Sequence, residues 1–103
     1  MDTIVTYLTA LQGKVFKLLP MRESYDKGID NNLYEYLSNL YDNCAGAFLC
    51  FPELSGKGML IEVQNNIAFL KNADDVKFSK WRSIVLRSTR LIHTVLDEYR
   101  EEA

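Results

Sequence analysis

Acid–base chemistry has one candidate pair in this sequence, formed by His93 and Asp97. His93 is the only histidine, and a carboxylate four residues later lies one helical turn away, where it can orient an imidazole. Ser83 and Ser88 belong to the same predicted helix but lie on other faces, so neither completes a nucleophilic pair. We therefore expect no catalytic residue and interpret His93 as a surface or boundary residue. A contact to a partner and an acid–base role in a small hydrolase are the alternatives for His93.

Metal-binding and cofactor-binding motifs are missing from the sequence. A structural zinc site needs four ligands from Cys and His, whereas this chain has one histidine with no cysteine near it. The Glu-x-x-His pairs of carboxylate-bridged metal bundles do not occur. The stretch 55–58 (Ser-Gly-Lys-Gly) lacks the upstream glycine and the following Ser or Thr of a phosphate-binding loop. We expect neither a metal nor a cofactor.

The two cysteines, Cys44 and Cys50, fall within one predicted helix, six residues apart. This spacing places them on different faces and more than a turn apart, too far for a disulfide within the helix. We expect both to be reduced thiols that fill the core as small apolar side chains, as is usual in the cytoplasm.

Basic residues gather in the last predicted helix. Lys80, Arg87 and Arg90 share one face, and no acidic residue occurs between positions 76 and 96. Guanidinium groups on one helical face suit phosphate or carboxylate, because each donates hydrogen bonds in pairs. Phosphate contact by these three residues is one interpretation, and a solvated face balanced by acidic residues elsewhere is the other. Since the net charge is −2, we expect any binding to nucleic acid to be weak.

The candidate residues above are expected to lie on helices. Apolar residues recur at alternating steps of three and four along four segments, and this spacing keeps side chains on one face of an α-helix. The four series are Ile4, Leu8, Leu11, Val15, Leu18; Leu33, Leu37, Leu40, Cys44, Ala47, Phe51; Leu60, Val63, Ile67, Leu70; and Phe78, Trp81, Val85, Ser88, Ile92, Val95, Tyr99. The predicted helices span about 3–19, 32–51 and 59–71, and a fourth runs from between 75 and 79 to about 100. Pro20 and Pro52 are expected to end the first two, since the residue before a proline avoids helical backbone angles.

Four amphipathic helices with short connections can bury one common seam. The sequence therefore predicts an all-α fold, an antiparallel four-helix bundle, in a single domain over residues 1–103. No apolar run approaches the roughly 20 residues that span a bilayer, so we expect no membrane association. The start of the chain does not have the pattern of a signal peptide, which favours a cytoplasmic location.

Apolar residues that lie outside the four apolar series are the feature of the sequence that most strongly indicates a function. Tyr34, Tyr41 and Phe48 follow one another at seven-residue spacing beside the main seam of the second helix, and Val5 and Phe16 flank the seam of the first. Further residues of this kind are Ile61, Phe69 and Leu86. A small bundle needs few such residues, so the surplus indicates a protein interface, with Tyr34, Tyr41, Phe48, Val5 and Phe16 as its candidate residues. The alternative is an irregular bundle that covers them with loops.

Two short stretches carry a resemblance to known proteins. Residues 13–23 (Gly-Lys-Val-Phe-Lys-Leu-Leu-Pro-Met-Arg-Glu) and 51–54 (Phe-Pro-Glu-Leu) are similar to short, uncharacterised helical proteins of bacterial mobile elements and phage-related islands. Neither stretch has a known chemical role, so the resemblance brings no site residues. It implies a setting in bacterial or phage cytoplasm and a role in defence, counter-defence or regulation of an element.

Two functions of different classes follow from these observations. The first is a non-enzymatic interaction module, which is a small subunit, adaptor or inhibitor that binds a protein partner or a second copy through its apolar flanks. The second is an accessory subunit associated with nucleic acid, which contacts phosphates through the basic face of the fourth helix.

Overall fold

The computed structural model describes residues 3–23, 31–72 and 76–102, and these residues are helical throughout apart from short connections. The elements are α1 (Thr3–Phe16), α2 (Leu18–Glu23), α3 (Asn31–Cys50), the 3-10 turn η1 (Pro52–Gly56), α4 (Gly58–Lys71) and α5 (Phe78–Glu102). No strand occurs in the described part of the chain, so the predicted all-helical class is confirmed there.

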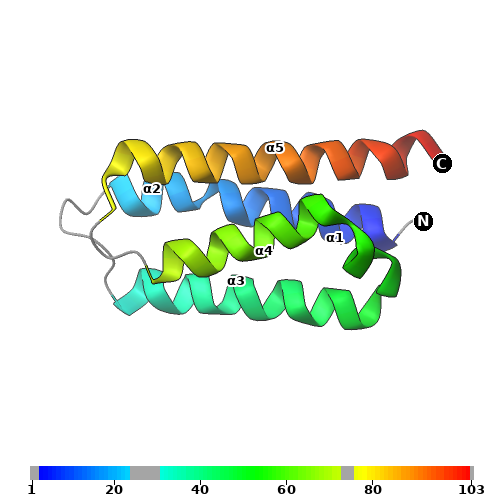
Figure 1. The fold of residues 1–103 in the computed structure, drawn as a ribbon, viewed down its shortest axis with the longest axis horizontal. Coiled ribbons are helices and arrows are strands. Elements are labelled where there is room, and N and C mark those ends of the chain that lie inside the picture. The colour runs from blue at the N-terminus through cyan, green and yellow to red at the C-terminus, as the bar shows by residue number, and fades with distance from the viewer. Residues whose placement is uncertain (1–2, 24–30, 73–75, 103) are drawn as a thin grey trace.

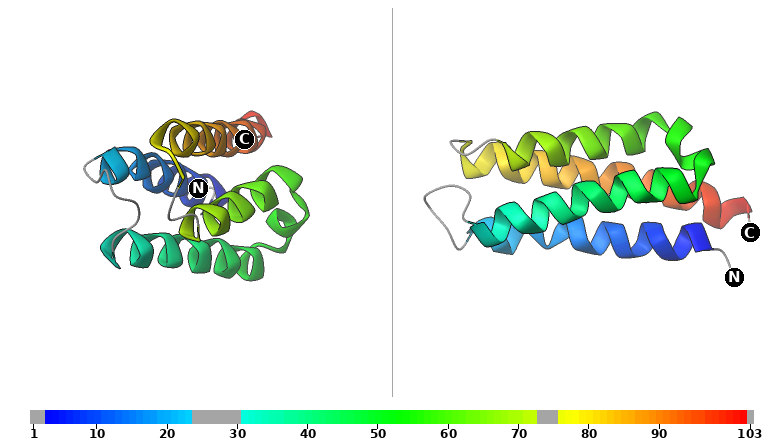
Figure 2. Two further views of the ribbon diagram at one scale, coloured as in Figure 1. Left: turned by 60° about the vertical axis from the view of Figure 1, so that its left-hand side comes forward. Right: turned by 90° about the horizontal axis from the view of Figure 1, so that it is seen from below.

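The four long helices lie along the long axis of an elongated molecule of 43 × 22 × 21 Å (Figure 1). Helix α5 packs against α1 on one side and α4 on the other, and α4 also packs against α3. Two further views show the same neighbours, with both ends of the chain at one end of the molecule (Figure 2). Helix α4 therefore lies between α3 and α5.

The first predicted helix is divided in two, and Pro20 does not end it. The interruption falls at Lys17, and Pro20 lies in the first turn of the short helix α2. Proline lacks the amide hydrogen that would bond the carbonyl four residues earlier, on Phe16, so the helix breaks there. In a first turn that amide is not needed, so proline is tolerated. The chain stays nearly helical across the break, since the Met21 amide donates to the Lys17 carbonyl at 3.3 Å.

The core consists of the predicted apolar seams. Every residue of the four series is buried except Phe51 and Phe78, which are half-buried. Leu54 is also fully buried, although it lies in η1, between the second and third predicted helices. Pro52 ends α3 as predicted, and the 3-10 turn that follows it packs Leu54 against α3 and α4.

Cys50 does not fill the core, contrary to the sequence analysis. Cys44 is buried in α3, whereas Cys50 is exposed at the end of the same helix, and both thiols are free. Six residues correspond to about 600° of helical rotation, so the two side chains point in different directions. Burial raises the pKa of the Cys44 thiol, which lies against Tyr7 of α1.

An arginine is buried at the junction of α2 and α5. Arg22 is 5% exposed, its guanidinium donates to the Val76 carbonyl at 2.8 Å, and it lies 5.6 Å from the centroid of the Trp81 ring. The Trp81 indole in turn donates to the Leu18 carbonyl at 3.3 Å. These contacts fix α2 against the start of α5.

Candidate interaction surface

Six large apolar side chains of the described residues are exposed on the folded chain. They are Phe16 (53% exposed), Tyr34 (45%), Leu49 (84%), Met59 (40%), Ile61 (40%) and Phe69 (43%). Tyr34 and Phe16 belong to the predicted interface, and Ile61 and Phe69 to the further residues outside the seams. The other predicted interface residues, Tyr41, Phe48 and Val5, are half-buried and pack against the core.

The stripe of Tyr34, Tyr41 and Phe48 lies on the side of α3 that faces α4. Lys71, the last residue of α4, extends across to α3, with its ammonium 5.3 Å from the Tyr34 ring centroid and 5.8 Å from that of Tyr41. At these distances the ammonium is attracted by both ring faces. The stripe therefore forms one wall of the boundary between α3 and α4.

Val5 and Phe16 lie on a different flank of the molecule. Gln12 stands seven residues after Val5 and four before Phe16, so the three share one face of α1. The Gln12 amide donates to the Thr89 carbonyl of α5 at 3.3 Å, which directs this face toward α5. The opposite side of α1 faces α3, where Tyr36 donates to the carbonyl of α1 residue 14 at 2.7 Å. Val5 and Phe16 are thus not beside the tyrosine stripe.

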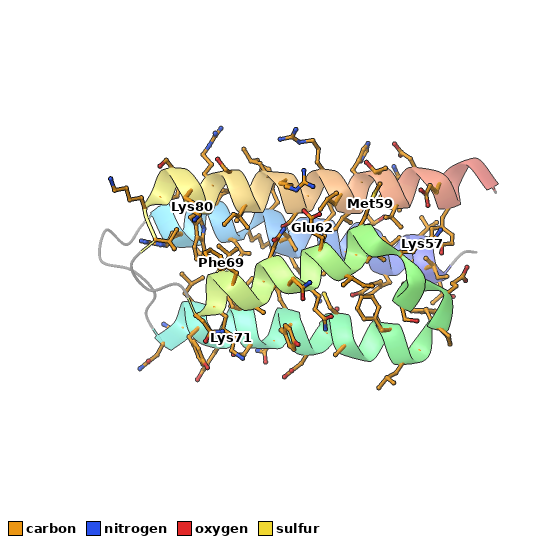
Figure 3. The ribbon with its side chains drawn as sticks, in the orientation of Figure 1. Lys57, Met59, Glu62, Phe69, Lys71 and Lys80 are labelled. Atoms are coloured by element: carbon orange, nitrogen blue, oxygen red, sulfur yellow. The ribbon has the colours of Figure 1, made fainter. Side chains whose placement is uncertain are left out.

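Phe69 lies at the other boundary of α4, beside α5. The ammonium of Lys80, in the first turn of α5, is 5.4 Å from its ring centroid. Figure 3 shows Phe69, Lys71 and Lys80 at one end of the molecule, and Met59 and Lys57 toward the other. The C-terminal half of α4 is therefore flanked by a lysine–aromatic contact on each side. Lys71 lies over rings of α3 on one side, and Lys80 of α5 lies over Phe69 on the other.

The three predicted phosphate contacts differ in their surroundings. Arg87 donates two hydrogen bonds to the carboxylate of Glu62 on α4, one of them from its Nη2 at 3.1 Å. This contact holds the pKa of Glu62 below its usual range. Lys80 rests on the Phe69 ring, whereas Arg90 lines an open surface depression together with Arg87, Leu91 and Thr94. One of the three cations is already neutralised within the chain.

His93 and Asp97 have the geometry expected from their spacing. The imidazole Nε2 lies 3.3 Å from the Asp97 carboxylate, which also lies 3.9 Å from the Arg100 guanidinium. About half of each side chain in the His93–Asp97 pair is accessible to solvent. Among the described residues, no group of three or more His, Cys, Asp or Glu side chains has an arrangement that would hold a metal ion.

Lys71 has no feature in the sequence that marks it as a site residue. Lys71 directly follows Leu70, so the sequence identifies it only as a polar residue at the end of a predicted helix. Its contact with Tyr34 and Tyr41 depends on α3 and α4 being neighbours, which helical spacing within one segment does not specify. Apolar spacing had singled out Phe69, but not its lysine partner.

Comparisons with protein-family models, with curated proteins and with solved structures give no significant match. Within the described ranges, no helix combines the length and apolar character that crossing a bilayer requires.

Proposed function

We propose that the chain is an antiparallel four-helix bundle that acts as a non-enzymatic protein-interaction module. As a small subunit, adaptor or inhibitor, it binds a protein partner or a second copy through the outer surface of α3 and α4, including the side of α4 that lies beside α5. The observation that carries this proposal is the exposure of Tyr34 (45%), Ile61 (40%) and Phe69 (43%) on these two helices. The core is already filled by the four apolar seams, so these side chains are not needed to complete it.

The residue types on this face support the same function. Tyrosine and phenylalanine offer large contact areas at low cost in side-chain entropy, and aromatic residues are enriched where interfaces concentrate their binding energy. The hydroxyl groups of Tyr34 and Tyr41 tolerate water when the face is unoccupied. Leu49 adds a strongly exposed side chain at the end of α3.

The test combines Tyr34→Ser with Tyr41→Ser. Oligomeric mass is measured by size-exclusion chromatography with light scattering, and partner capture by affinity purification from the source cells. We expect the double variant to keep its helicity and to lose either self-association or the captured partner. Phe16→Ser is the matched control, because Phe16 is exposed on the flank of α1 beside α5. An unchanged mass together with unchanged capture would contradict the proposal.

The alternative of a nucleic-acid-associated subunit has less support. It requires Lys80, Arg87 and Arg90 to contact phosphates together, and Arg87 is already bonded to Glu62. A setting in bacterial mobile elements or phage islands, in defence or counter-defence, rests on the resemblance of residues 13–23 and 51–54 alone. A cytoplasmic location is part of the same proposal, and it agrees with the two free thiols.

A further inference from the structure

The end of the molecule where α4 finishes has a cluster of aromatic rings and lysines. Its members come from three helices, and we call them the lysine–aromatic patch: Tyr34 and Tyr41 of α3, Phe69 and Lys71 of α4, and Lys80 of α5. The rings of Tyr34 and Phe69 are 45% and 43% exposed. Figure 3 shows Phe69, Lys71 and Lys80 at this same end of the molecule, with Lys71 on the α3 side of α4 and Lys80 on α5.

The two lysines of the patch differ from the other cations that contact α4. Lys57 also lies over a ring, that of Tyr99 at 5.5 Å, but its ammonium is paired with Glu98 at 3.2 Å. Arg87 is paired with Glu62. Among the described residues, neither Lys71 nor Lys80 has a carboxylate within ion-pair distance, and the ammonium of each lies over an aromatic ring. The patch therefore presents two positive charges that the described part of the chain does not neutralise.

A ligand that fits this patch must combine negative charge with apolar groups. Carboxylates of such a ligand would pair with the two ammonium groups, and its apolar side chains would cover the exposed parts of the rings. Opposite charges across an interface favour encounter and fix the register of binding. An acidic amphipathic segment of a protein has both features.

Single-stranded nucleic acid is the other ligand that combines negative charge with flat apolar groups. Its bases bind proteins by stacking on the faces of aromatic rings. In the patch, one face of each ring already lies against a lysine of the chain itself, Lys71 for Tyr34 and Tyr41 and Lys80 for Phe69. The geometry thus favours carboxylates over stacked bases.

We propose that the lysine–aromatic patch binds an acidic amphipathic segment of a partner protein, with carboxylates on Lys71 and Lys80 and apolar side chains on Tyr34 and Phe69. This inference rests on the proposed function and specifies the chemistry of the partner. It is tested with a random peptide library displayed on yeast, selected against the full chain at about 0.15 M salt. Selected peptides are then synthesised, and their affinity is measured by fluorescence anisotropy.

The expected result is enrichment of peptides that contain both Asp or Glu and large apolar residues. Combining Lys71→Gln with Lys80→Gln should weaken their binding about tenfold. Lys57→Gln is the matched control, because Lys57 also lies over a ring but is paired with Glu98, and this variant should bind as the wild type does. Asp74 and Asp75 are outside the described residues, and replacing both by Asn should leave the selected peptides bound at least as tightly.

Four results would overturn the inference: no enriched peptide, enriched peptides without acidic residues, equal loss in the Lys57→Gln variant, or tighter binding of an oligothymidylate than of any selected peptide. The proposed function fails separately. If the selected peptides lack acidic residues but lose binding to the Tyr34→Ser variant, the inference of an acidic partner is contradicted, whereas the proposed interaction face is supported. Both the inference and the proposed function would be contradicted by a combination of two results. The selected peptides would bind the Tyr34→Ser variant as they bind the wild type, and the double tyrosine variant would keep its oligomeric mass and its captured partner.

Discussion

At the scale of single residues, the two thiols differ in exposure, and we expect them to differ in reactivity for that reason. Iodoacetamide should label Cys50 in the native protein, whereas Cys44 should react only after unfolding, because it is buried and its pKa is raised by burial. Mass spectrometry before and after denaturation counts the labelled thiols. A Cys50→Ser variant should remain unlabelled while folded. Comparable labelling of both cysteines in the native state would show that the α1–α3 contact around Cys44 is open.

Arg22 is the buried cation on which the α2–α5 junction depends. Replacing it by Ala removes the hydrogen bond to the Val76 carbonyl and the contact with Trp81, and it leaves that carbonyl poorly satisfied. We expect the free energy of unfolding to fall by about 1–3 kcal/mol. Urea denaturation followed by far-ultraviolet circular dichroism measures it. Arg82→Ala, at an exposed position of α5, is the control and should change stability by about 0.5 kcal/mol or less. Equal effects of the two substitutions would contradict the structural role of Arg22.

At the scale of elements, α3 separates its core face from its outer face within one helix. Leu40 is 3% exposed and Leu49 is 84% exposed. Leu40→Ala should lower the free energy of unfolding by about 2–4 kcal/mol, because it removes buried methyl groups and leaves a cavity. Leu49→Ala should change it by about 0.5 kcal/mol or less. Denaturation of both variants under the same conditions provides the comparison, and similar costs would show that α3 is rotated relative to the structure.

Helices α4 and α5 are joined by groups of different kinds along their shared boundary. Asn66 donates to the buried Ser88 hydroxyl at 3.0 Å, and Glu62 pairs with Arg87 nearer the surface. The lowered pKa of Glu62 means that the pair stabilises the fold while the carboxylate is ionised. This contribution is present above the ordinary pKa of Glu62, and it is lost as the pH falls through the lowered pKa. Acidification therefore weakens the outer edge of this boundary.

At the scale of the whole molecule, the charge distribution bears on nucleic-acid binding. The net charge is −2, and the basic face of α5 is partly neutralised by Glu62. We expect weak, non-specific binding of labelled duplex DNA at physiological salt, with affinity that falls steeply as salt rises. Combining Arg87→Glu with Arg90→Glu should abolish it in fluorescence anisotropy. Tight binding by the wild type at about 0.15 M salt would favour the nucleic-acid alternative over the interaction module.

The amino-acid sequence by itself determined the apolar faces of the four long helices, and nearly all residues of those faces are buried. Leu8, Leu37, Val63 and Val85 are buried where the spacing of three and four placed them, because this period follows from the geometry of a single helix. Pro20 correctly indicated a break in the first predicted helix, but whether a proline ends a helix or only interrupts it depends on where the next helix begins. Proline is tolerated in a first turn, so the residue marked an interruption at Lys17 and not an end.

Only the tertiary structure decided which side chains meet across helices. Lys71 contacts Tyr34 and Tyr41, and Arg87 contacts Glu62. These pairs depend on α4 lying between α3 and α5, which the periodicity within each segment leaves open. The same arrangement separates Phe16 from the tyrosine stripe. The candidate interaction surface is therefore a property of helix packing, because the order of helices around the core determines which flanks share a face.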